Sequence, residues 1–265
     1  MLDHLLALIF TNQWIVFATA SSLLLAAAES GYRFGISARR KSSKKAEGHS
    51  GAVQGSVLGL LGLLLGFSFA MAVARNDTRR NLAVEEANAI GTTWLRADFV
   101  GEQKAKQVHT LLRHYSELRI DAYGNAKGEE NFLPLKEQAV GIQQKLWNIA
   151  REAAEESPNP VTMGFVNSVN ETIDIQSRRL AARRDHVPGA VWLLLFSVAG
   201  CGAWSSGYGS GSNGHRSIFS QFVFPVLIGV VITLISDIDR PREGIIGVSQ
   251  QPLVELLDSM ESSAR

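Results

Sequence analysis

The sequence predicts an all-α integral membrane protein with four transmembrane helices and a helical extramembrane domain between the second and third spans. Charged residues are absent from four stretches: 12–28, 52–74, 187–204 and 218–236. The residues between the second and third stretches instead place apolar side chains at i, i+3 and i+4, which is typical of helices with one buried face. No alternation typical of a β-strand persists anywhere. The arrangement is therefore two pairs of spans on either side of a water-exposed helical domain.

The apolar stretches have the lengths that membrane spans need. The 23 residues of 52–74 reach ~34 Å as a helix, which exceeds the ~30 Å of a hydrocarbon core. The third and fourth stretches, with 18 and 19 residues, lie near the lower limit. In the first, Thr11, Asn12 and Gln13 separate an apolar segment at 5–10 from the following run, and we expect one long helix with a polar interruption. A signal peptide is disfavoured because no Lys or Arg precedes Arg33.

We expect four regions along the chain. They are a first pair of spans at 1–74 with a basic loop at 35–50, a helical extramembrane domain at 75–187, a second pair of spans at 188–237, and a C-terminal tail at 238–265. Within the domain, Gly124-Asn125 and Pro158-Asn159-Pro160 end two of the helical patterns. The glycine- and serine-rich segment 205–214 is interpreted as a flexible connection between the third and fourth spans.

The second span is expected to continue past Ala74 as one helix of nearly fifty residues, because no proline interrupts it and its backbone hydrogen bonds then stay internal. Small residues form a stripe at spacings of 4, 3, 4 and 4, which lets another helix approach closely; they are Gly55, Gly59, Gly62, Gly66 and Ala70. Alternatively, several copies of this helix surround an axis and form a hydrophobic constriction. The pore-lining candidates are Gly59, Leu63, Gly66, Phe67, Ala70, Met71 and Ala74.

Beyond the membrane this helix carries two different faces. Ala83, Ala87, Ile90 and Trp94 form a small apolar seam that predicts tight packing. A polar stripe at helical spacing is either a solvated face or the lining of an aqueous vestibule, and it consists of Glu85, Asn88, Thr92 and Arg96.

A group of charged residues is expected on one side of the membrane. Asp237, Asp239 and Arg240 close the fourth span, and Arg75, Arg79 and Arg80 follow the second span. Carboxylate and guanidinium groups are expected to pair across helices. In an oligomer, the same residues would form charged rings at a pore mouth.

The sequence gives no support for an enzyme, a metal site, a bound cofactor or nucleic-acid binding. The single cysteine, Cys201, excludes an intramolecular disulfide framework and a thiolate cluster. His109 and His114 point to different helix faces, and no pair of nucleophile and base stands out.

The expected partners are the lipid bilayer, further copies of the chain and small inorganic ions. The expected location is the cell (inner) membrane, but basic residues are divided almost evenly between the two sides, which leaves the side of the 75–187 domain open.

Three segments together resemble a known family. They are GLLLGFSFAMAVARNDTRRNLAVEEANAIGTTWLRAD, LLRHYSELRIDAY and ISDIDRPREGIIGVSQQPL, in that order along most of the chain. They look like the bestrophin-like family of bacterial four-span membrane proteins. The resemblance implies a homopentameric anion channel with two pairs of spans around a helical domain and a pore lined by the second span. The acidic calcium site of animal bestrophins has no counterpart in the sequence.

The function predicted from these observations is a homo-oligomeric channel for small ions. Anions are slightly preferred, because Arg75, Arg79 and Arg80 lie at the end of the candidate pore helix. One alternative is a membrane-anchored interaction or signalling module without conductance. Another is a subunit of a stator-like, ion-driven complex, which would need a partner helix with a proton-carrying carboxylate.

Overall fold

A computed structural model describes residues 12–41, 49–126, 128–240 and 246–263. Almost all of these residues are helical, and no strand occurs among them. Four helices are long and apolar enough to cross a membrane. The predicted all-α membrane fold is therefore confirmed. The chain forms two compact units, one made of Met1–Ala74 with His186–Ile246 and the other of Arg75–Asp185 with Gly247–Arg265.

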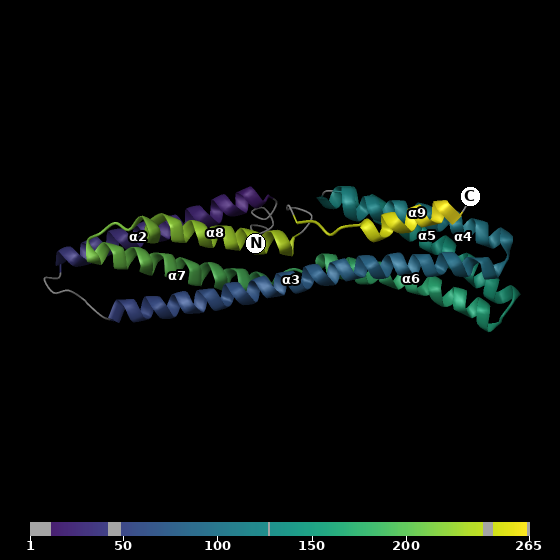
Figure 1. Cartoon of the computed structure of the whole chain (residues 1–265), viewed down its shortest axis with the longest axis horizontal. Helices are drawn as coiled ribbons and strands as arrows, with labels where there is room; N and C mark the ends of the chain where they lie inside the picture. Colours follow the sequence, from purple (N-terminus) through teal and green to yellow (C-terminus); the bar gives the residue numbers. More distant parts are fainter. Residues whose placement is uncertain (1–11, 42–48, 127, 241–245, 264–265) are drawn as a thin grey trace. The chain divides into compact units, whose positions relative to one another are not determined.

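The first unit contains the candidate spans (Figure 1). Helices α2 (Gln13–Lys41), α7 (Gly189–Asn213) and α8 (Phe224–Asp239) pack together, and a π-helical turn, η3 (Phe219–Val223), leads into α8. The N-terminal part of α3 (His49–Ala97) contributes Leu61 and Ala72 to the same core. That core is apolar throughout, which agrees with helices that pack against one another in lipid.

Helices α2 and α7 approach closely at glycines. A Cβ atom on Gly207 would overlap the carbonyl oxygen of Ala28, and one on Gly31 would overlap that of Trp204. Gly35 and Gly211 face each other's helices in the same way. The interpretation of 205–214 as a flexible connection was therefore wrong, because α7 continues as a helix to Asn213 and uses these glycines for packing.

The connection between the first two spans is shorter than expected. Helix α2 continues to Lys41 and α3 begins at His49, so Arg39 and Arg40 lie in a helix rather than in the loop predicted at 35–50. Lys44 and Lys45 lie outside the described residues, as does the apolar segment at 5–10.

The second unit is built from helices that precede and follow the second pair of spans in the sequence (Figure 1). These are α4 (Glu102–Ile120), α5 (Gly128–Glu156), α6 (Pro160–Arg184) and α9 (Gln251–Ser263), with a short turn η1 (Asp98–Val100) and a π-helical turn η2 (Asp121–Asn125). Asn159 caps α6 by accepting hydrogen bonds from the backbone N–H groups of Val161 and Thr162. Leu253 and Met260 of α9 are buried in the core of this unit, so the segment assigned to a tail packs against α4.

Helix α3 is one unbroken helix of 49 residues. The prediction that the second span continues without interruption past Ala74 is therefore confirmed. Along α3, residues three or four apart therefore share a face.

Candidate functional site

The membrane segment of α3 has one exposed face that contains nearly all of the pore-lining candidates. Leu63 and Phe67 are 54% and 63% exposed, although both are large apolar side chains. Gly59, Gly66, Ala70 and Ala74 are exposed beside them, whereas Met71 is half-buried and packs against the core of the first unit. Exposed apolar residues on one side of a spanning helix contact lipid, another protein surface or a pore.

The glycines of this face pack against no other described residue of the chain. A Cβ atom on Gly55, Gly59, Gly62 or Gly66 would meet no atom within 4 Å outside the surrounding backbone of α3. The close approach that the sequence suggested for this stripe is therefore not made inside the described part of the chain. Lipid, a second copy, or an open axis between several copies is what remains for it to face.

The helical spacing of this face continues into residues 75–97 with polar side chains. Asp77, Asn81, Asn88 and Thr92 are exposed and follow Ala74 at intervals of three, four, seven and four residues. Sequence reasoning had identified Asn88 and Thr92 but missed Asp77 and Asn81, although their spacing from Ala70 and Ala74 was a usable signal. The exposed face thus changes from apolar to polar at about residue 75.

Two members of the predicted polar stripe interact with α6. Glu85 accepts a hydrogen bond of 3.2 Å from Arg178 and remains exposed. Arg96 is half-buried and donates to the carbonyl oxygen of Gly164 at 2.7 Å. Glu85, Asn88 and Thr92 therefore form the exposed part of the stripe, and Arg96 fixes α3 to α6.

The opposite face of α3 is held firmly in the second unit. Ala83, Ala87 and Ile90 of the predicted seam are buried. The indole of Trp94 stacks on the imidazole of His109 with 3.9 Å between ring centroids, and the hydroxyls of Thr93 and Thr172 lie 2.9 Å apart. The seam therefore packs tightly, as predicted, and determines which face of α3 is left exposed.

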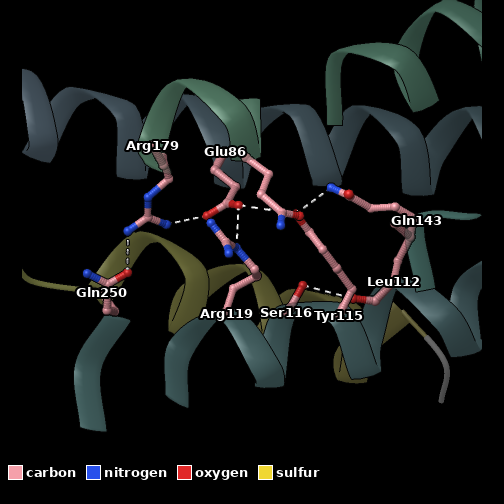
Figure 2. Close-up of polar contacts among 9 residues, drawn as sticks. Glu86, Leu112, Tyr115, Ser116, Arg119, Gln143, Arg179 and Gln250 are labelled. Carbon is pink, nitrogen blue, oxygen red and sulfur yellow. Dashed lines mark hydrogen bonds and ion pairs between the residues drawn. The ribbon is translucent and has the colours of Figure 1, made fainter. Parts of the chain in front are cut away.

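A buried cluster of charges lies on this packed face (Figure 2). Glu86 of α3 accepts a hydrogen bond of 2.7 Å from Nε of Arg119 on α4 and forms an ion pair with Arg179 on α6. Arg179 also donates to the side-chain oxygen of Gln250, next to α9, at 2.9 Å. Glu86, Arg119 and Arg179 are at most 3% exposed. Glu86 and its two arginines thus join α3, α4 and α6, and Arg179 links them to the segment that leads into α9.

Polar and aromatic groups surround the cluster. The hydroxyl of Tyr115 lies 3.3 Å from Glu86 and 3.3 Å from Gln176, so its one proton serves one of them at a time, and it accepts from Gln143 at 3.2 Å. The π-helical turn η2 places the ring of Tyr123 against both arginines, 4.6 Å from the guanidinium carbon of Arg119 and 4.0 Å from that of Arg179.

The protonation states follow from burial and charge. Burial alone would raise the pKa of Glu86, but the guanidinium groups of Arg119 and Arg179 outweigh it and hold that pKa below its ordinary value. Burial raises the pKa of the Tyr115 hydroxyl well above its usual value. Glu86 is therefore an anion at neutral pH, Tyr115 is neutral, and the cluster holds α3 electrostatically rather than exchanging protons.

The predicted charged group is only partly exposed. Arg75 forms an ion pair of 2.6 Å with Asp185, and Arg79 is buried and donates to the carbonyl oxygens of Ala182 and Asp185, whereas Arg80 is exposed. Asp239 is fully buried and accepts from the backbone N–H of Val187 at 3.0 and 3.1 Å. Asp237, also buried, accepts from the backbone N–H of Ile246 at 3.1 Å, and Arg240 is half-buried. Pairing between the arginines and these aspartates, or charged rings, stays a prediction.

The described ranges contain no group of three or more His, Cys, Asp or Glu side chains arranged to hold a metal ion. The charged residues that they do bring together include ion pairs of carboxylates with guanidinium groups and with lysine ammonium groups.

Comparisons with known proteins give one family model and a set of solved structures with a similar fold. A family model described as Bestrophin-like domain matches residues 17–253. A variant of a bacterial bestrophin homologue from Klebsiella pneumoniae has a TM-score of 0.64 at 15% identity, covering 92% of this chain and 95% of that one. A second variant gives 0.61 at 15% identity, with 93% and 96% covered, and a third gives 0.60 at 15%, with 90% and 96% covered. At these identities the likeness concerns the fold alone. A comparison with curated proteins found no match.

Proposed function

This chain belongs to the bestrophin-like family, and from that membership and the site we propose that it forms a homo-oligomeric channel for small inorganic ions. Copies of the chain surround an axis in the cell membrane, with the exposed face of α3 towards that axis. By family resemblance the oligomer is a pentamer.

The observation that carries this proposal is the exposed face of α3. A helix that passes from lipid into water would also change from apolar to polar, so the exposed face supports a pore together with the family membership. A pore accounts for both halves, because large apolar side chains form a constriction and the polar residues beyond it line a vestibule. The pore-lining set is Gly59, Leu63, Gly66, Phe67, Ala70 and Ala74, with Met71 at its edge.

Electrical recording from the purified protein in planar bilayers tests this proposal. We expect currents from the wild type and a larger conductance for Phe67→Ala, because the ring is removed from the constriction. Phe219→Ala is the matched control, since this ring is exposed to a similar extent on η3 rather than on α3. Absence of current across voltages, pH values and salts, or equal effects of the two substitutions, would contradict the proposal.

The sign of the permeant ion needs a separate test. The predicted slight preference for anions rests on Arg75, Arg79 and Arg80, but Arg75 pairs with Asp185, and Arg79 is buried. Asp77 is exposed at the start of the polar stripe and favours cations instead. A reversal potential measured across a salt gradient distinguishes the two.

If Asp77 faces the permeant ions, Asp77→Asn should move the reversal potential towards the equilibrium potential of the anion. Asp174→Asn, which removes another exposed carboxylate, on α6, should leave the reversal potential unchanged. A wild-type reversal potential at the anion's equilibrium potential would instead support the preference predicted from the arginines. Conductance of either sign also excludes the alternative of an interaction module without transport.

A further inference from the structure

A small hollow in the first unit has no role in the proposed pore. It has a volume of about 360 Å³ and lies between α2 and the segment that joins α7 to α8. Its lining consists of Leu25, Glu29, Arg216, Ile218, Gln221 and Phe222. One end of this hollow is therefore charged and the other is apolar.

The charged end carries more positive than negative charge. Glu29 accepts hydrogen bonds of 2.8 Å from both Arg33 and Arg216, and one of 3.0 Å from the side-chain nitrogen of Gln221. Two guanidinium groups therefore share one carboxylate, which leaves an excess of one positive charge. The side chain of Arg216 is 61% exposed, so its remaining N–H donors can reach a ligand.

Gln221 contributes to the hollow a side-chain oxygen that lacks a hydrogen-bond donor among the described residues. The residue is only 9% exposed, and no described group of the chain bonds its side-chain oxygen. Its amide cannot be turned around without loss, because a carboxylate cannot donate and Glu29 therefore requires the nitrogen. A hydroxyl group of a bound molecule is the kind of donor that this oxygen needs.

The apolar end adjoins the membrane core. Ile218 and Phe222 are 76% and 57% exposed and belong to the charge-free stretch 218–236, while Leu25 belongs to the stretch 12–28. Glu29 directly follows the first of these stretches, and Arg216 lies two residues before the second. The hollow therefore lies at the boundary where lipid headgroups meet hydrocarbon chains.

We propose that this hollow binds a phospholipid with an anionic glycerol-phosphate headgroup. The phosphate pairs with Arg216, a headgroup hydroxyl donates to Gln221, and an acyl chain packs against Leu25, Ile218 and Phe222. Arginine suits this role because its planar N–H groups match phosphate oxygens. The proposal does not depend on ion conduction, since it concerns only the described residues of the first unit.

Mass spectrometry of the protein released from bilayers that contain equal amounts of phosphatidylglycerol and phosphatidylcholine tests the proposal. We expect the wild type to retain phosphatidylglycerol preferentially. For Arg216→Ala this preference should fall about fivefold, the factor that corresponds to roughly 1 kcal/mol for each basic residue near anionic lipid. Arg216→Lys should keep most of the preference, because the positive charge remains. Arg151→Ala is the matched control, since it removes an exposed arginine of α5 in the other unit.

Two further arms identify the source of the phosphate and the role of the apolar end. Glycerol phosphate without acyl chains should not displace the retained lipid, and Phe222→Ala should reduce retention of both lipids. Displacement by glycerol phosphate would instead show a site for a free phosphate compound and would overturn the lipid proposal. An unchanged lipid preference in Arg216→Ala would also overturn it. Dissociation of the oligomer in that variant, with the preference unchanged, would show that another copy covers the hollow.

Discussion

Glu86 shows how much depends on a single carboxylate in this chain. It is fully buried between Arg119 and Arg179, so Glu86→Gln would leave two buried guanidinium groups without their anion. We expect this substitution to lower the free energy of unfolding by about 3–5 kcal/mol. Glu85→Gln, one residue earlier, removes an exposed ion pair with Arg178 and should cost less than about 1 kcal/mol. Thermal unfolding of the purified proteins measures both, and equal losses would contradict the assigned role of Glu86.

The ionisation of Glu86 makes the free energy of unfolding depend on pH under acidic conditions. Because the pKa of Glu86 is lowered on folding, its contribution is fully present above the ordinary value of 4.5 and is lost as the pH falls through the lower pKa of the folded state. The difference in melting temperature between wild type and Glu86→Gln should therefore stay constant from pH 7 to about pH 5 and become smaller below about pH 4.5. A difference that grows in acid would mean that the pKa of Glu86 is raised instead.

Among single residues, the sequence indicated Glu85 as part of the polar stripe, whereas the buried Glu86 was missed. Residue 86 is three positions after Ala83 and one before Ala87, so helical spacing placed it on the predicted seam. A charge on a buried seam predicts buried partners, but Arg119 and Arg179 are 33 and 93 positions away. Local spacing could reveal the buried carboxylate, and only the tertiary fold reveals what neutralises it.

At the scale of the helices, glycines of the same type have opposite roles. Gly207 lies against the carbonyl oxygen of Ala28, and neither backbone can yield to an added methyl group, so Gly207→Ala should destabilise the protein by about 1–3 kcal/mol. Gly66 on α3 has no such neighbour among the described residues, so Gly66→Ala should be neutral or stabilise the helix by up to about 1 kcal/mol. Thermal unfolding and the measured oligomer mass check both substitutions.

Gly66→Ala could instead dissociate the oligomer while the helix content stays the same. That result would show that another copy packs closely against the α3 stripe. The glycines would then serve association rather than line an open axis.

The helices were largely predictable, whereas the role of each glycine was not. Lengths and charge-free stretches indicated the four spans, and the absence of proline indicated that α3 continues. The segment 205–214 was misread because glycine and serine have low helix propensity, which close packing in the membrane overrides. Gly31 and Gly35 on α2, and Gly207 and Gly211 on α7, each have the spacing of four that favours such packing, so the signal was present in the sequence.

At the scale of the whole molecule, the second unit is completed by a segment that follows the last span. Helix α9 has only 13 residues, and its apolar pattern shows that one face is buried but not which helix covers it. The structure places Leu253 in the core with α4, and the neighbouring Gln250 accepts from Arg179 in the Glu86 cluster. Gln250 and Leu253 therefore support the same helix whose other face is proposed to line the pore.

This connection predicts how two adjacent substitutions in α9 differ. Leu253 is fully buried, and Leu253→Ala should lower the free energy of unfolding by about 2–5 kcal/mol through the cavity that it leaves. Val254, 36% exposed, is the matched control, and Val254→Ala should change the free energy of unfolding by less than about 0.5 kcal/mol.

Amide hydrogen exchange should become faster in 251–263 for Leu253→Ala only. If the helix contributes to holding α3 through Gln250 and Arg179, exchange should also become faster around Glu86, whereas a change confined to α9 would show that the helix is only an accessory to this unit.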